Sequence, residues 1–324
     1  MPESNSETRR RLLVYLPNEV AAFTPTAQQI TRLAARLPDV EVVHAPDEPA
    51  FRRELSNANG VVVWSFEASD YAQAPHLEHV FTPSAGRERI ALDPEGRVQA
   101  HFGTFHGAIM AETLLAMMLF LGRRLDAAVA AQRARQWERD VYTTTRRLSG
   151  QTAVIVGYGA IGRRCATLLR AVGMTVIGVR RHPENDADRG AAERVVAVRD
   201  LPEVLARADH VACILPGDTG TDRLIGPGAF AHLKPGAFVY NLGRGNAIDL
   251  RALADALASG HVAGAYLDVF PEEPLPRDSP LWNTPNLHIL PHASAVCSEY
   301  LDLYFDELAA WFERQRPLER ATNG

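Results

Sequence analysis

The sequence predicts an α/β protein built on two parallel, doubly wound sheets. Short runs of β-branched and aliphatic residues alternate along the chain with amphipathic helical stretches, and this alternation favours parallel strands joined by helical crossovers. The chain has 324 residues, of which 46% are hydrophobic and 23% are charged. That length and composition are typical of a soluble protein with two domains of ordinary size.

The first part of the chain contains three predicted strands and one predicted helix. The strands are LLVYL at 12–16, VEVVH at 40–44 and VVVW at 61–64, and the helical pattern covers 26–37. From 107 to 136 the chain is rich in helix-forming residues and has few breakers, so we expect one long helix that connects two domains.

A second series of strands and helices begins after residue 150 and predicts a sheet of six or seven strands. The segment 298–316 is again amphipathic, and we expect it to return to the first domain. The predicted division is therefore 1–117 plus 293–324 for one discontinuous domain, and 118–292 for a domain inserted into it. The predicted strands of the second series are TAVIV (152–156), TVIGV (175–179), DHVACIL (209–215), AFVYNL (237–242), VAGAYLDV (262–269) and NLHIL (286–290).

Charge and cysteine use narrow the classes of partner. The net charge of -5 and the pI of about 6.1 give no broad basic field for nucleic acid or an anionic membrane, so a small molecule is the expected ligand. Cys165, Cys213 and Cys297 show no C-x-x-C or metal-ligand spacing, which favours a reduced cytoplasmic setting and no bound metal. The polar N-terminus differs from a signal peptide, and Arg123 and Arg124 interrupt the longest apolar run well short of the roughly 20 residues that span a membrane.

A glycine-rich turn follows the strand predicted at 152–156 and opens a helix. Gly157 permits the tight turn, Gly159 lets the backbone approach a pyrophosphate, and Gly162 lets the helix pack closely on the strand. The spacing G-x-G-x-x-G is weak evidence alone, but strand, turn, helix and second strand are all present. The phosphates would meet unpaired N–H groups at the helix N-terminus. The expected cofactor-binding residues are Gly157, Tyr158, Gly159, Ala160, Ile161 and Gly162.

The end of the next strand bears on the choice of cofactor. An acidic residue there commonly holds the ribose 2′-hydroxyl of NAD, whereas this chain has Arg180, followed by Arg181 and His182. Guanidinium groups suit a 2′-phosphate, so NADP(H) is favoured over NAD(H). The alternative is that an arginine-rich chain shows such a pair by accident on a solvated loop, which leaves NAD(H) as a usable cofactor.

Three polar residues stand at the ends of predicted strands: Arg244, Glu273 and His292. Such ends line the ligand crevice of an open α/β sheet. Each alone has an ordinary structural interpretation, as a surface arginine, a solvated acid or a satisfied histidine. Five segments in the stretch 152–292 also follow the order of motifs in a known family: VGYGAIG, LPGDTGTDRLI, LKPGAFVYNLGRGNAID, GAYLDVFPEEPLP and NLHILPH. By these motifs the chain resembles the D-isomer-specific 2-hydroxyacid dehydrogenases, the family of glyoxylate and hydroxypyruvate reductases.

The resemblance implies that His292 is the acid and base, Glu273 its partner, and Arg244 the anchor for the substrate's carboxylate and ketone oxygen. The chemistry agrees, because hydride transfer to a ketone leaves an alkoxide that needs a proton from a group titrating near neutrality. A carboxylate beside the imidazole favours its charged form, and a planar guanidinium binds carboxylate and stabilises charge on oxygen. Glu272 competes for the partner role, but the spacing from Asp268 matches the family only at Glu273.

The resemblance also implies the remaining ligand contacts. The substrate carboxylate would meet the N–H groups of Ala85 and Gly86 in the TPSAG run, and the substrate side chain would meet residues 64–66. The expected contacts with the nicotinamide, adenosine and ribose are Asp268, Leu242, Gly243, Leu215, Pro216 and Thr221.

Three departures from the family pattern accompany these matches. Asp218 stands where threonine is usual, Thr113 stands where histidine is usual, and HASA replaces a glycine-containing run after His292. The last departure leaves the substrate preference open, since those residues neighbour the catalytic imidazole.

The sequence therefore predicts two Rossmann-like domains in an oxidoreductase that transfers hydride between NADPH and a small 2-keto acid. We expect a homodimer, with Trp137 buried in its interface; the alternative, which the resemblance implies for some relatives, is a tryptophan near the active site of the neighbouring subunit. One rival is a dehydrogenase of the same fold that acts on formate or phosphite, which does not need to protonate a ketone oxygen in this way. The other is a cofactor-sensing binding protein of the corepressor type, which the three intact catalytic residues argue against.

Overall fold

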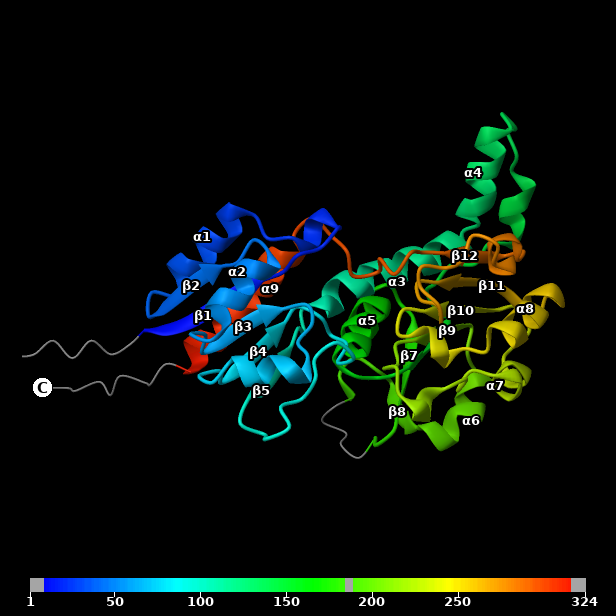
Figure 1. Cartoon of the computed structure of the whole chain (residues 1–324). Coiled ribbons are helices and arrows are strands. Elements are labelled where there is room, and N and C mark those ends of the chain that lie inside the picture. Colours follow the sequence, from blue (N-terminus) through cyan, green and yellow to red (C-terminus); the bar gives the residue numbers. More distant parts are fainter. Residues whose placement is uncertain (1–8, 184–188, 316–324) are drawn as a thin grey trace, which may run out of the picture. The chain divides into compact units, whose positions relative to one another are not determined.

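The computed structural model describes residues 9–183 and 189–315, which divide into two compact units (Figure 1). Unit 1 consists of 9–105 and 296–315, and unit 2 of the described residues from 106 to 295. Each unit contains one all-parallel sheet with helices, so the predicted α/β fold with two parallel sheets is confirmed. The first boundary lies before α3 (His106–Gly122), whereas position 117, where the sequence placed it, is inside that helix.

The sheet of unit 1 has the strand order β2-β1-β3-β4-β5. Leu12 of β1 lies opposite Val42 of β2 and Gly60 of β3, which sets the register of the centre of the sheet. The strands are β1 (Arg10–Tyr15), β2 (Val40–His44), β3 (Gly60–Val63), β4 (His79–Thr82) and β5 (Gln99–Phe102), and the helices are α1 (Ala27–Arg36), α2 (Glu48–Leu55) and α9 (Tyr300–Gln315).

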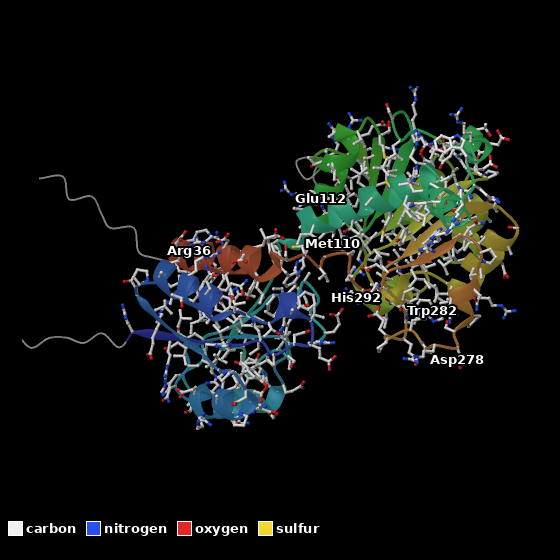
Figure 2. The ribbon with its side chains drawn as sticks, turned by 90° about the horizontal axis from the view of Figure 1, so that it is seen from above. Arg36, Met110, Glu112, Asp278, Trp282 and His292 are labelled. Atoms are coloured by element: carbon white, nitrogen blue, oxygen red, sulfur yellow. The ribbon has the colours of Figure 1, made fainter. Side chains whose placement is uncertain are left out.

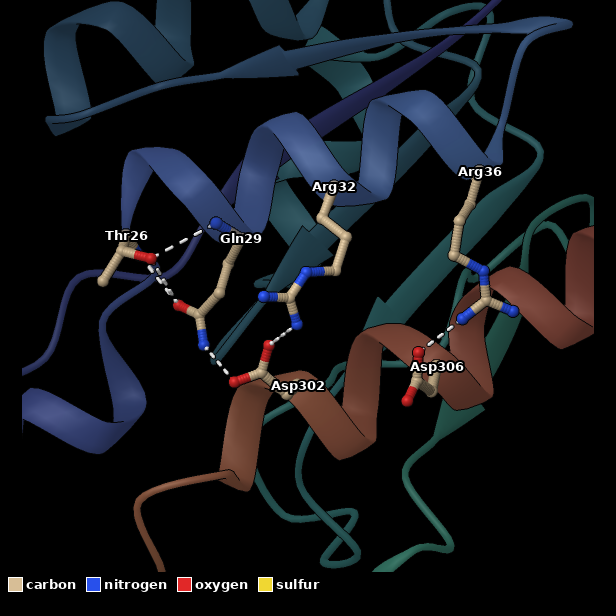
Figure 3. A network of polar contacts seen from close by, with 6 residues as sticks. All are labelled: Thr26, Gln29, Arg32, Arg36, Asp302 and Asp306. Atoms are coloured by element: carbon tan, nitrogen blue, oxygen red, sulfur yellow. Dashed lines mark hydrogen bonds and ion pairs between the residues drawn. The ribbon is translucent and has the colours of Figure 1, made fainter.

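The C-terminal helix α9 lies beside α1 within unit 1 (Figure 3). Thr26 caps α1 by accepting the N–H of Gln29, whose side-chain amide donates to Asp302 of α9 at 3.0 Å. Arg32 donates to the same aspartate at 2.7 Å, and Arg36 pairs with Asp306. These polar contacts fix the register of two helices that are about 270 residues apart in sequence.

The sheet of unit 2 has seven strands in the order β12-β11-β10-β9-β6-β7-β8. Its strands are β6 (Thr152–Val156), β7 (Thr175–Arg180), β8 (Arg194–Ala197), β9 (His210–Cys213), β10 (Ala237–Asn241), β11 (Val262–Leu267) and β12 (Leu287–Ile289). Its helices are α3, α4 (Leu125–Arg133), α5 (Ala160–Ala171), α6 (Leu201–Leu205), α7 (Pro227–His232) and α8 (Leu250–Ala258).

Both faces of this sheet are covered, and strand β6 shows how. Val154 and Val156 belong to the core formed with α6, α7 and α8. Ala153 and Ile155, which alternate with them, belong to the core formed with α3 and α5. A strand buried on both faces reads as a continuous apolar run, and this explains why TAVIV shows no polar alternation.

The single long helix predicted for 107–136 is wrong, because the chain turns at Arg124. This residue adopts a left-handed conformation with φ of 52°, and its Nε lies 3.2 Å from Asp126. Helix α3 ends at Gly122, whose carbonyl accepts the N–H of Arg146 at 3.0 Å. The nine helical residues of α4 are not buried, so α4 lacks the tertiary packing that holds α3 on the sheet. The sequence interpretation also missed the four-residue strands β4, β5 and β8.

Candidate functional site

Loops at the carboxyl edge of the unit 2 sheet pack backbone against backbone at three glycines. Gly157 has φ of 100°, and a Cβ there would overlap the carbonyl of Ile214. A Cβ on Gly243 would lie 2.5 Å from the backbone N of Leu215, and one on Gly245 would overlap the carbonyl of Phe270. The loops after β6, β9, β10 and β11 are therefore held against one another without intervening side chains.

The glycine turn after β6 fits the pyrophosphate of a dinucleotide. Helix α5 starts at Ala160, so the N–H groups of its first turn have no acceptor within the helix and carry the positive end of the dipole. A Cβ on Gly159 would meet no atom within 4 Å, which leaves space over the helix N-terminus for a ligand. A Cβ on Gly162 would lie 2.8 Å from the carbonyl of Gly157, which explains the third glycine by packing.

Tyr158, predicted from sequence as a cofactor contact, has its side chain in the core. Its hydroxyl lies 2.7 Å from the carbonyl of Arg189 and accepts the N–H of Ala192 at 3.2 Å. The ring fills the space over Gly178, where a Cβ would come within 2.5 Å. Burial raises the pKa of this phenol, and its backbone N–H donates to Val179 at 2.9 Å. The residue supports the turn from within, and its hydroxyl and backbone N–H are both engaged inside the protein.

The arginines predicted to select the cofactor stand at the end of β7, which neighbours β6. Arg180 is the last residue of the strand and is partly buried, and Arg181 is exposed. Arg181 Nη2 lies 3.1 and 3.2 Å from the carboxylate oxygens of Asp218 in the loop after β9. Thr221 in the same loop is buried, and its hydroxyl lies 2.8 Å from the carbonyl of Pro216. Thr221 therefore shapes the loop.

The other predicted neighbours of the nucleotide differ in exposure. Leu215 and Leu242 are buried, with 9% and 3% of their surface exposed, whereas Pro216 is exposed. Gly243, the neighbour of Leu242, donates its N–H to the side-chain oxygen of Asn241 at 3.1 Å. Of these four residues, Pro216 is the one whose side chain reaches solvent.

His292 and Glu273 are joined directly. Nδ1 of His292 lies 2.7 Å from Oε2 of Glu273, and Oε1 of Glu273 accepts the N–H of Phe270 at 2.8 Å. The carboxylate fixes the proton on Nδ1, which leaves Nε2 for a substrate. His292, labelled in Figure 2, has φ of 53°, and half of its side chain (51%) is exposed, so a ligand can reach it.

The loop that carries His292 is anchored by Asp268, a fully buried residue. Its two carboxylate oxygens accept the N–H groups of Ala293 at 2.6 Å and Ser294 at 3.0 Å, and its carbonyl accepts the N–H of His292 at 2.8 Å. Thr113 of α3 donates to the carbonyl of Ser294 at 2.8 Å. The carboxylate predicted to meet the nicotinamide is thus engaged inside the protein, and the departure at Thr113 supports the same loop.

Arg244 follows β10, the neighbour of β11, in a loop that Asn241 organises. The buried Asn241 donates to the carbonyl of Arg244 at 3.0 Å, and Arg244 Nη1 donates to the carbonyl of Gly243 at 2.9 Å. Sequence reasoning missed Asn241 and Phe270 as organising residues. Their signal is weak, since one is an asparagine at a strand end and the other acts through its backbone.

Ala85 and Gly86, the predicted carboxylate contacts, lie in the loop after β4 of unit 1. Gly86 donates its N–H to the hydroxyl of Ser84 at 3.1 Å, and Ala85 is exposed. Trp64, at the end of the neighbouring strand β3, packs against Phe23 with ring centroids 5.3 Å apart.

Within 9–183 and 189–315, no helix combines the length and apolar character needed to cross a membrane.

The fold and the site together define a class of protein, the dinucleotide-dependent oxidoreductases. The features that define it are a seven-stranded parallel sheet, a glycine turn at a helix N-terminus and a histidine–carboxylate pair at the same edge of the sheet. Residues 115–294 match the family model described as "D-isomer specific 2-hydroxyacid dehydrogenase, NAD binding domain". The chain belongs to the D-isomer-specific 2-hydroxyacid dehydrogenase family. The resemblance stated from the sequence is confirmed, and with it a nicotinamide cofactor as the class of hydride carrier.

Three relatives illustrate the match. Glyoxylate/hydroxypyruvate reductase B of Pectobacterium carotovorum is 34% identical over 264 residues, which cover 78% of this chain and 79% of the relative. D-3-phosphoglycerate dehydrogenase of Mycobacterium bovis is 33% identical over 272 residues, but this chain spans about half (50%) of its length. The solved structure of an NADPH-dependent glyoxylate/hydroxypyruvate reductase from Sinorhizobium meliloti, with NADP and sulfate, has a TM-score of 0.75 and 26% identity, and the match covers 96% of this chain and 97% of that one.

Proposed function

We propose that this enzyme reduces a small 2-keto acid, such as glyoxylate or hydroxypyruvate, to its D-2-hydroxy acid and prefers NADPH as the hydride donor. The observation that carries the proposal is the His292–Glu273 pair, with 2.7 Å between nitrogen and oxygen, in a loop anchored by a buried carboxylate. The similarity to glyoxylate/hydroxypyruvate reductases supports the substrate class.

The bound cofactor supplies hydride to the carbonyl carbon, and the chain's own residues handle the charge that results. Arg244 binds the substrate carboxylate and stabilises negative charge growing on the ketone oxygen. The imidazolium of His292 donates its Nε2 proton to that oxygen, and Glu273 stabilises the imidazolium before the transfer. In the direction of oxidation the neutral imidazole takes the hydroxyl proton. Formate or phosphite oxidation has no ketone oxygen to protonate, and a corepressor needs no proton donor, so this pair favours keto-acid reduction.

NADPH is the preferred cofactor because β7 ends at Arg180 and Arg181 follows it, where a carboxylate would serve NADH. Charge-assisted hydrogen bonds to a 2′-phosphate contribute about 1.5–3 kcal/mol each, and solvent screening lowers that on an exposed loop. We expect a preference of tens of fold in kcat/KM at moderate salt. Arg180→Asp should weaken NADPH binding, with little effect on turnover at saturating cofactor. Equal kcat/KM with both cofactors in the wild type would remove this part of the proposal.

A homodimer is also proposed, with α4 and the segment after it as the contact region. Figure 1 shows α4 standing away from the sheet of unit 2. Leu125, Val129 and Trp137 are 42%, 42% and 88% exposed in the single chain, and Arg139 lies 5.7 Å from the ring centre of Trp137. A second copy would bury this apolar surface. Light scattering should give twice the 35.5 kDa chain mass, and Trp137→Ser should shift the equilibrium toward monomer.

The test of the proposed function is a panel of 2-keto acids assayed with both cofactors by loss of absorbance at 340 nm. His292→Gln should lower kcat by about 10²–10⁴ and leave NADPH binding unchanged, since general acid catalysis contributes that much and the phosphate turn is untouched. His76→Gln, at an exposed position of unit 1, serves as the matched control. Turnover of His292→Gln within a few-fold of the wild type would refute the assignment.

A further inference from the structure

We infer that Asp218 determines part of the cofactor selectivity: its ion pair with Arg181 holds that guanidinium away from a 2′-phosphate and weakens the preference for NADPH. The inference rests on the proposed binding of a nicotinamide dinucleotide along β6. It assigns a role to a residue that takes no part in the chemical step, and to the departure from the family pattern at position 218.

The ion pair joins the loops that flank the glycine turn. Strands β7 and β9 lie on either side of β6 in the sheet, Arg181 directly follows β7, and Asp218 follows β9 by five residues. The nucleotide of a doubly wound sheet binds at the carboxyl end of its first strand, with the ribose toward the end of the second. An interaction between these two loops therefore lies beside the expected adenosine ribose.

The loop around Asp218 is fixed independently of Arg181. The backbone carbonyl of Asp218 accepts the N–H of Thr221 at 3.0 Å, and the Thr221 hydroxyl lies 2.7 Å from the same carbonyl. A Cβ on Gly220 would lie 3.1 Å from Arg181 Nη2 and 3.1 Å from Asp218 Oδ1, so a side chain there would press on both partners of the ion pair. The backbone that carries Asp218 is therefore held in place, and its carboxylate meets Arg181 from this fixed point.

The charges explain the effect on selectivity. A 2′-phosphate carries between one and two negative charges at neutral pH and needs Arg181 free of a competing anion. Asp218 supplies such an anion within 3.2 Å, which NADH tolerates and NADPH must displace. The two side chains are 62% and 45% exposed, so the pair is weak and the phosphate can break it. Removal of the carboxylate should tighten binding of a 2′-phosphate by about two- to fivefold.

The experiment uses adenosine 2′,5′-bisphosphate and ADP as probes, so that neither turnover nor the nicotinamide enters the measurement. Dissociation constants are measured by calorimetry at low and moderate salt for the wild type, Asp218→Asn, Arg181→Gln and the double variant. Glu203→Gln is the matched control, because it removes the same charge from another exposed arginine pair of unit 2, with 2.9 Å between Arg194 and Glu203.

The expected result is tighter binding of the bisphosphate to Asp218→Asn, no change for ADP, and no change with Glu203→Gln. The gain should vanish in the Arg181→Gln background, since there is then no guanidinium to release. An unchanged bisphosphate affinity, an equal gain for ADP, or a gain of the same size without Arg181 would each overturn the inference. Failure of the proposed function would show separately, as no 2-keto acid reduction or no NADPH preference in the wild type.

Discussion

Oε2 of Glu273 lies 2.7 Å from Nδ1 of His292, while its other oxygen accepts the backbone N–H of Phe270 at 2.8 Å. One carboxylate thus connects the turn after β11 to the imidazole after β12. The carboxylate has its orientation set by the backbone and its charge directed at the ring. The neighbouring Glu272 is exposed and offers an internal control.

Glu273→Gln should lower kcat for keto-acid reduction by about tenfold or more, because a neutral amide is a weaker acceptor for the Nδ1–H of His292 than a carboxylate. Glu272→Gln should leave kcat unchanged. A loss of kcat with Glu272→Gln and none with Glu273→Gln would reverse the assignment of the partner.

Arg244→Lys should raise KM for the keto acid by about tenfold or more and lower kcat, since an ammonium cannot reproduce a two-pronged contact with a carboxylate. The dissociation constant of NADPH should change less than KM for the keto acid. Arg251→Lys, at an exposed position on α8, provides the control for a general effect of the exchange. Weaker cofactor binding with an unaltered KM for the keto acid would reassign Arg244 to the cofactor.

Asp268→Asn should lower both the stability of the protein and its kcat. A buried hydrogen bond to a charged group contributes about 1.5–3 kcal/mol, so the Tm of unit 2 should fall by roughly 3–12 °C. One of the two N–H groups of Ala293 and Ser294 then faces an amide NH2 in place of an acceptor, and kcat should fall because the loop that carries His292 is held less firmly. Asp200→Asn, at a half-exposed acid, should change neither quantity. If weaker NADPH binding were the sole effect, Asp268 would act on the nicotinamide and not on the loop.

Acid should destabilise unit 2 through His210, which lies 2.6 Å from Gln151 and 3.0 Å from the hydroxyl of Tyr240. Burial lowers the pKa of His210 to about 4, from an ordinary value of 6.5. As the pH decreases from 6.5 to about 4, the unfolded chain binds a proton at His210 that the folded chain does not yet bind. The free energy of unfolding therefore decreases over this pH range. The slope from this group is at most about 1.4 kcal/mol per pH unit. Urea unfolding at pH 7.5 and 5.5 measures it, and His210→Asn should flatten the dependence.

Much of the carboxyl edge of unit 2 could be predicted from the sequence, because there the backbone itself demands particular residues. Gly157 and Gly162 have the geometric reasons given for them, a positive φ at the first and a helix packed on a strand at the second. Glu273 and His292 lie at the predicted strand ends and meet. These are short-range constraints that leave their trace in a few adjacent letters.

Tertiary packing decided the points where the sequence misled. Position 124 holds neither the glycine nor the asparagine that usually marks a left-handed residue, and the helix ends where the Gly122 carbonyl accepts the N–H of the distant Arg146. Tyr158 belongs to a glycine motif, yet its ring packs over Gly178, which lies 20 residues further along the chain. Asp268 is used by a loop 25 residues downstream. Such partners are invisible in a local pattern.

The backbone contacts at Gly157, Gly243 and Gly245 bear on how this protein can be redesigned. A single added methyl at these positions would collide with main chain, which cannot rotate aside as a side chain would. Combinatorial libraries that aim at new ligands should therefore keep these three codons constant. Diversity is better placed at Pro216, Asp218 and Arg181, whose side chains reach solvent and can change without moving the frame.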